Sequence, residues 1–208
     1  MPEDQTQSQT YQEFLHEKHA QFQAPDELIL KEVKKASDSS PVKKERLFLG
    51  ESSEVYAIQT EDGQEVIMRI SRNGYPRFDA ERWALDQSSA VGVPVPEVLL
   101  TDRVTVDGDE LALCIQRKIE GQPLDSLAST LNSDQLRNLI NKAGSMLAKI
   151  HSVPTVGFGE LDENGKGEYF SWDDYIFALV DREAVLMEAA ERTSYSQDKV
   201  HHALNLLQ

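Results

Sequence analysis

The sequence contains a single cysteine, Cys114, which excludes an intrachain disulfide and a cysteine-based metal site. It has no run near the ~20 apolar residues that a membrane-spanning helix requires, and residues 1–20 lack the apolar segment of a secretory signal. Basic residues are few, 21 against 36 acidic ones, so the formal net charge is −15. Such a charge would repel nucleic acids and anionic membranes. We therefore expect a cytoplasmic protein that binds neither.

Turn signals and apolar spacing divide the chain into a region of strands and a later region of helices. Residues 1–24 are polar and are expected to form a disordered or weakly helical extension. Pro25 opens a helix, and residues 37–41 are expected to link it to the first strand. Asp62-Gly63 and Asp107-Gly108 are two-residue hairpin signals. The pattern predicts strands at residues 46–49, 54–60, 65–71, 97–104 and 110–116, and a helix at 79–89.

Beyond Gly121 the apolar residues recur at helical spacing. Helices are predicted at residues 134–151, 172–190 and 196–207. The last of them carries no Gly, Pro or polar tail that would end it. We therefore expect this sequence to be part of a longer protein.

Gly50, Glu51, Ser52 and Ser53 lie between the first two predicted strands. A turn of Gly and small residues lets backbone N–H groups approach phosphate oxygens closely. Ordinary hairpins have the same composition, so this segment alone does not distinguish a phosphate site from a plain turn.

Arg69 lies in the middle of the third predicted strand. Strand alternation places Ile67 and Arg69 on one face and the apolar residues around them on the other. A cation among apolar neighbours needs an anionic partner, and Glu81, in the following helix, is the candidate. A cation held by Glu81 and facing the Gly50 turn would suit nucleotide phosphates. An edge-strand arginine with its guanidinium group in water is an equal alternative.

Gln116, Arg117, Lys118 and Ile119 follow an apolar strand and precede Gly121. A short extended link of this kind resembles a connection between two lobes, where backbone groups could hydrogen-bond an adenine edge. An ordinary strand-to-helix loop explains the same residues.

Eight segments in one order connect these candidates. They read R-L-F-L-G-E-S-S-E-V-Y-A-I, D-G-Q-E-V-I-M-R-I, A-E-R-W-A-L, G-V-P-V-P-E-V-L, L-C-I-Q-R-K-I-E-G-Q-P-L, A-G-S-M-L-A-K-I-H, V-G-F-G-E-L-D and S-W-D-D-Y-I. In order and wording they resemble the aminoglycoside phosphotransferase family, relatives of the protein kinases that phosphorylate small molecules. The resemblance implies an α+β, protein-kinase-like fold. Its small lobe, with a five-stranded antiparallel sheet, would span residues 25–115, its hinge 116–121, and the first part of a helical lobe 122–208.

The resemblance also implies a role for each candidate residue. Residues 50–53 would cover the nucleotide phosphates, and Arg69 takes the place of the strand lysine that contacts ATP phosphates in kinases. Glu81 would pair with Arg69. Arginine here departs from the protein-kinase pattern, which has lysine at this position. Its planar guanidinium group would contact phosphate with a different geometry. Ile67 would lie over the adenine, and residues 116–119 would be the hinge.

The family's catalytic loop, H-G-D followed by Asn, and its later metal-binding Asp do not occur in this sequence. We expect them beyond Gln208, and we expect the chain alone to be inactive. The complete protein would be a monomer that transfers the γ-phosphoryl group of ATP or GTP, with Mg²⁺, to a hydroxyl of a small molecule. The alternative is a degenerate kinase fold that binds nucleotide or a partner without catalysis. A purely structural domain fits if Arg69 and Glu81 form only a surface pair.

Overall fold

The computed structural model describes residues 13–17, 19–20, 23–48, 53–72, 77–127, 129–180 and 182–206. The chain forms two compact units, Met1–Val153 and Pro154–Gln208. The lobe boundary expected at residues 116–121 stays a prediction.

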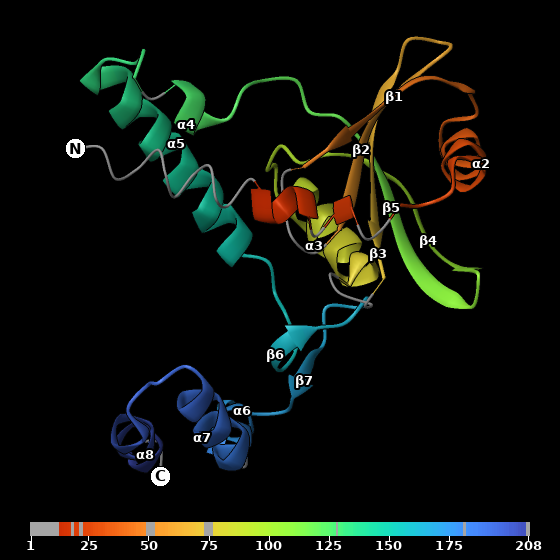
Figure 1. Cartoon of the computed structure of the whole chain (residues 1–208). Coiled ribbons are helices and arrows are strands. Elements are labelled where there is room, and N and C mark those ends of the chain that lie inside the picture. The colour runs from red at the N-terminus through yellow and green to blue at the C-terminus, as the bar shows by residue number, and fades with distance from the viewer. Residues whose placement is uncertain are drawn as a thin grey trace. The chain divides into compact units, whose positions relative to one another are not determined.

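A five-stranded antiparallel sheet is the centre of the first unit (Figure 1). The strand order is β1-β2-β3-β5-β4, so β3 is the central strand. Asp107 and Gly108, which join β4 to β5, both have positive φ angles (53° and 93°), as a two-residue hairpin turn requires. The five strands predicted from the sequence are confirmed. Their bounds are β1 Pro41–Leu47, β2 Glu54–Thr60, β3 Glu65–Ser71, β4 Val98–Val106 and β5 Asp109–Arg117.

The first strand begins earlier than the sequence predicted. β1 starts at Pro41, where a linker was expected, and not at Arg46. It is an edge strand, and an edge tolerates both lysines and a proline without an N–H group. The polar composition of β1 therefore hid it from a search for alternating apolar residues.

The two faces of the sheet pack against different helices. Helix α2 (Asp26–Ser37) and helix α3 (Phe78–Ala90) lie on opposite sides of the sheet (Figure 1). Helix α2 contributes Ile29 and Val33 to the main core, and α3 contributes Phe78 to a smaller one. Because successive strand residues point to opposite faces, β5 supplies both clusters. Its residues Leu111, Leu113 and Ile115 join the main core, and Ala112 and Cys114 join the smaller one.

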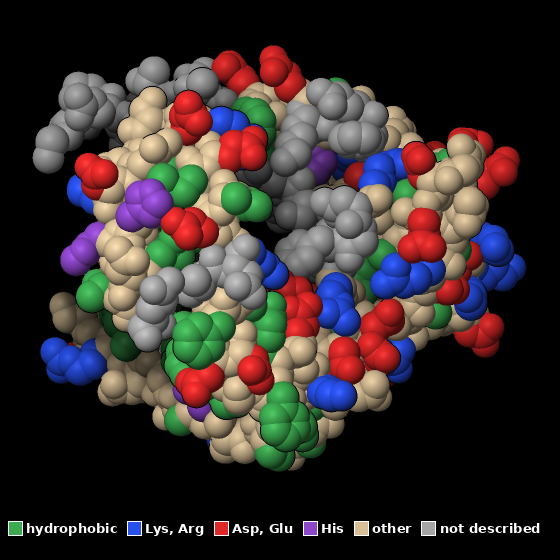
Figure 2. Space-filling view, turned by 90° about the horizontal axis from the view of Figure 1, so that it is seen from below, with side chains coloured by type: hydrophobic (Ala, Val, Ile, Leu, Met, Phe, Trp, Pro, Cys, Tyr) green, Lys and Arg blue, Asp and Glu red, His purple; other side chains and the backbone are tan. Residues whose placement is uncertain are grey.

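Ion pairs join the elements at the surface. Lys35 Nζ of α2 lies 2.5 Å from Asp102 Oδ2 of β4. The hydrogen bond from Lys35 lowers the pKa of the Asp102 carboxyl. On the face shown in Figure 2, acidic and basic side chains are interspersed among the described residues. The acidic side chains visible on this side are therefore not gathered into a single patch.

Helix α5 (Ser133–His151) follows the short helix α4 (Leu124–Leu127). The Asn132 side chain accepts hydrogen bonds from the backbone N–H groups of Asp134 and Gln135, and the Gln135 side chain caps the Asn132 N–H in return. This capping box explains why the helix begins there. None of the residues of α5 is buried.

The described residues of the second unit form a hairpin and three helices. The hairpin, β6 (Phe158–Leu161) and β7 (Gly167–Tyr169), was not predicted from the sequence. A Cβ atom at Gly167 would lie 2.4 Å from the Phe158 carbonyl oxygen, so the two strands require a glycine there. The single helix predicted at 172–190 is wrong. It is divided into α6 (Trp172–Val180) and α7 (Glu183–Arg192), before α8 (Gln197–Asn205). Within the described part of the chain, no helix combines the length and the apolar character needed to cross a membrane.

Candidate functional site

Arg69 and Ile67 lie on the central strand β3, on the face opposite α2. Val66 and Met68, between and beside them, are fully buried in the main core, whereas Ile67 and Arg69 are only half-buried. The alternation expected from the sequence is therefore present. The edge-strand alternative for Arg69 is wrong, because β2 and β5 flank β3 on both sides.

Arg69 is paired with Glu81, which lies in the first turn of α3. Its Nη1 donates a hydrogen bond to Glu81 Oε1. The guanidinium carbon lies 4.9 Å from the centroid of the Phe78 ring, a distance at which a cation is attracted to an aromatic face. The two side chains of the pair are 24% and 30% exposed. A guanidinium has five N–H donors, so this pairing leaves Arg69 with donors for an anionic ligand.

Two residues of β2 share the face of Arg69, and neither was predicted as a site residue from the sequence. Ala57 lies opposite Ile67 in the β2–β3 register, and Val55 lies opposite Arg69. Both are half-buried, whereas their strand neighbours Glu54, Tyr56 and Ile58 are buried. Strand alternation was the signal that could have found them. Together with Ile67 they form an apolar surface beside the cation.

Cys114 lies beside Arg69 in the β3–β5 register. Burial, with a smaller contribution from the nearby Glu81 carboxylate, raises the pKa of the Cys114 thiol to about 11. The thiol is therefore protonated at neutral pH, and it is a packing residue of the smaller core.

The turn expected to cover phosphates is described only at its end. Gly50, Glu51 and Ser52 lie outside the described residues. Ser53 is half-buried, and its Oγ is buried without a hydrogen-bond partner among the residues that the structure describes. A buried hydroxyl at this position is a candidate ligand contact.

The expected hinge, residues 116–119, begins inside the sheet. β5 continues to Arg117, and the N–H groups of Arg117 and Lys118 donate to the carbonyl oxygens of Glu97 (2.9 Å) and Glu65 (3.0 Å). Their side chains also pair within this unit, since Arg117 Nε lies 2.5 Å from a Glu97 carboxylate oxygen. These two N–H groups are thus engaged, and an adenine edge would have to use other backbone groups of the segment, such as those at Ile119, which is 62% exposed.

The described residues contain no group of three or more His, Cys, Asp and Glu side chains placed to hold a metal ion. Asp174, near the start of α6, is a helix cap. Its carboxylate accepts from the N–H and Oγ of Ser171, whose Oγ accepts from the Asp174 N–H. The local role of this carboxylate is therefore to fix the first turn of α6.

Comparisons with known proteins place these features in a family. The model described as "Phosphotransferase enzyme family" (APH) matches residues 45–204, more than half of the chain. Hygromycin-B 4-O-kinase of Escherichia coli is 26% identical over 132 residues, which are 64% of this chain and 37% of that protein.

Two solved structures are similar to the chain. A candidate fructosamine-3-kinase from Thermobifida fusca has a TM-score of 0.52 and 14% identity over 86% of this chain and 59% of that one. An amicoumacin kinase in complex with AMP-PNP, Ca²⁺ and Ami has a TM-score of 0.40 and 18% identity over 48% of this chain and 32% of that one.

The chain spans less than two thirds of the length of each of these proteins. The likeness to the Thermobifida fusca structure confirms the α+β, protein-kinase-like fold. Arg69, Glu81 and strands β2 to β5 all lie within the matched residues, and the chain belongs to the phosphotransferase enzyme family.

Proposed function

We propose that this chain is the nucleotide-binding part of a phosphotransferase that transfers the γ-phosphoryl group of ATP or GTP to a hydroxyl of a small molecule. It would act as a monomer in the cytoplasm, where these nucleotides are available, and would use Mg²⁺ as its divalent ion. Membership of the phosphotransferase family supports the reaction type.

The observation that carries the proposal is that a cation and an apolar surface lie together on the half-buried face of the sheet, opposite α2. The guanidinium of Arg69 is fixed by Glu81, and Val55, Ala57 and Ile67 lie beside it on the same face. A nucleotide has the matching parts, a flat apolar base and a polyanionic chain. A preorganised cation contacts such an anion without reorganising when the ligand binds.

Each residue then has a distinct task. Arg69 binds and orients the phosphates, and Glu81 holds Arg69 in place. Ile67, with Val55 and Ala57, covers the base. Residues 50–53, through Ser53 Oγ and backbone N–H groups, contact the phosphates. Within residues 116–119, backbone groups other than the N–H groups of Arg117 and Lys118, such as those at Ile119, contact the base edge.

A non-catalytic nucleotide-binding protein is the second candidate. The same cation and apolar surface would serve it, because nucleotide binding needs no catalytic base. Under both candidates the 208-residue chain binds nucleotide but does not transfer phosphate. Turnover of Mg-ATP by this chain would contradict that expectation, and it would require a catalytic base among the residues present.

Nucleotide binding by calorimetry tests the proposal. Arg69→Ala removes a charge-assisted contact, which typically contributes about 1.5–3 kcal/mol, and should weaken ATP binding by about 10- to 100-fold. Adenosine, which has no phosphate, should bind both proteins equally. Arg103→Ala is the matched control, because Arg103 pairs with Glu110 on the exposed β4–β5 hairpin. Equal ATP affinities for Arg69→Ala and wild type would refute the proposed role of Arg69.

A further inference from the structure

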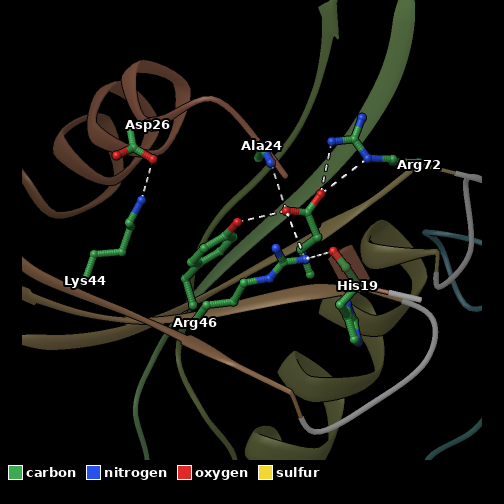
Figure 3. A network of polar contacts seen from close by, with 8 residues as sticks. His19, Ala24, Asp26, Lys44, Arg46 and Arg72 are labelled. Atoms are coloured by element: carbon green, nitrogen blue, oxygen red, sulfur yellow. Dashed lines mark hydrogen bonds and ion pairs between the residues drawn. The ribbon is translucent and has the colours of Figure 1, made fainter. Parts of the chain in front are cut away.

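A buried carboxylate at the first residue of β2 joins four parts of the first unit. Glu54 is 4% exposed, and its Oε2 accepts hydrogen bonds from the Ala24 N–H (2.9 Å) and the Tyr56 hydroxyl (2.8 Å). Its Oε1 accepts from Arg72 Nη2 (3.0 Å), and Arg46 Nη2 lies 3.8 Å from Oε2 (Figure 3). The N-terminal segment, β1, β2 and the end of β3 are thus connected through one side chain.

The N-terminal segment is packed onto the end of β1. Residues 13–17 and 19–20 are helical, and Leu15 and His19 are buried (1% and 4% exposed). The His16 ring lies 4.3 Å from the Phe48 ring, and the His19 carbonyl oxygen accepts a hydrogen bond from Arg46 Nη2 at 3.0 Å. The Arg46 guanidinium lies 5.4 Å from the centroid of the Phe48 ring. These contacts are specific and involve both polar and aromatic groups.

The position of this network relates it to the nucleotide face. Phe48 follows the last residue of β1, and Glu54 is the first residue of β2. The network therefore contacts the end of β1 and the start of β2, the two strand ends that the first hairpin connection joins. Arg72 follows β3 directly and lies three residues after Arg69. Because a charge in a dry site is costly unless its partners stay in place, Glu54 constrains all three strand ends together.

We infer that the described N-terminal residues 13–17, 19–20 and 23–24 form a brace of the nucleotide-binding site, together with Glu54 and Arg46, which are positioning residues. They contact no ligand. They hold the ends of β1, β2 and β3 in the arrangement that the nucleotide phosphates require. The inference rests on the proposed function, since it concerns the affinity for the nucleotide that the function predicts.

The first test uses the unmodified chain and hydrogen exchange. Coupling between two sites is reciprocal, so a brace that favours ATP binding must itself be stabilised by ATP. Saturating ATP should slow exchange of the brace amides at residues 13–17, 19–20 and 23–24 by about fivefold or more, and adenosine should slow it less. Unchanged exchange of these brace amides in a sample that binds ATP would overturn the inference. A wild-type chain that does not bind ATP would overturn the proposed function, and the inference with it.

The second test uses substitutions on the brace and a matched control. Leu15→Asp should undock the segment, and Phe48→Leu is a milder change that removes only the aromatic contacts. Both should raise the Kd for ATP, by about tenfold and about threefold, and leave the Kd for adenosine within about twofold of wild type. Arg103→Ala is the control, because it removes an exposed ion pair of the same unit, with Glu110, neither of whose members belongs to the network. Variants that melt at a lower temperature but bind ATP like wild type would reduce the brace to a purely structural element.

Discussion

The ion pair between Arg69 and Glu81 should stabilise the folded chain more than an exposed pair on the same helix. Exposed pairs contribute about 0–1 kcal/mol, whereas removing one partner of a fully buried pair costs about 3–5 kcal/mol. With side chains 24% and 30% exposed, this pair lies between those limits. We expect Glu81→Gln to lower the free energy of unfolding by about 1–2 kcal/mol, and the cycle with Arg69→Met to give a coupling energy of about 1 kcal/mol.

Urea unfolding monitored by tryptophan fluorescence measures this coupling. The chain has two tryptophans, and a Trp172→Phe background leaves Trp83, on α3 near the pair, as the sole reporter of the first unit. The control cycle uses Arg82 and Asp86, also on α3, whose charged atoms are 3.9 Å apart and whose side chains are 44% and 64% exposed. The coupling energy of that control cycle should be about 0.3 kcal/mol or less.

The same coupling energy in both cycles would refute this reasoning. It would mean that partial burial between α3 and the sheet does not strengthen the Arg69 pair. The guanidinium would then be no better fixed than a surface side chain, and its preorganisation for a phosphate would lose its physical basis.

Three further predictions test other parts of the structure. Met68→Ala, in the main core, should cost about 2–5 kcal/mol of stability, and Ile67→Ala, on the half-buried face, clearly less, as thermal melting will show. The ionised Asp102 carboxylate contributes to the free energy of unfolding of the wild type above the ordinary carboxyl pKa of 3.8. This contribution is lost as the pH falls through the lowered pKa of the folded state, and Asp102→Asn should remove it at every pH. The stabilities of Asp102→Asn and wild type should therefore converge in acid titrations below about pH 4. Gly167→Ala should disrupt the β6–β7 hairpin, whereas Gly144→Ala, in α5 with open space around its Cβ, should raise the melting temperature; equal effects would contradict the steric argument.

The strands and the main face of the site could be predicted from the sequence because short-range patterns determine them. Alternation in β3 separated Arg69 and Ile67 from the core residues, and the Asp-Gly turns placed two of the hairpins. The pairing of Arg69 with Glu81 was only one of two alternatives, because the sequence does not show the order of strands in the sheet. β3 becomes central only when β5 pairs with it, a contact between residues more than forty positions apart.

The parts that could not be predicted depend on distant contacts or lack local signals. The early start of β1 was hidden by lysines that only an edge strand tolerates. No Gly or Pro marks the end of α6 or the start of α7, so one apolar stripe suggested a single helix. The role of Glu54 could not be predicted either, because nothing local shows that Arg72 and Ala24 converge on it.

The single cysteine provides a site at which a thiol reagent can report the opening of β5. Cys114 is 1% exposed and has a pKa of about 11, so at pH 8 a thiol reagent can react only when β5 opens and exposes the sulfur. The rate at which the reagent modifies Cys114 therefore measures how often β5, the strand beside Arg69, opens. Any ligand that binds across β3 and β5 should slow the reaction, and the ratio of rates gives its affinity without a mutation, a fluorophore or a turnover assay.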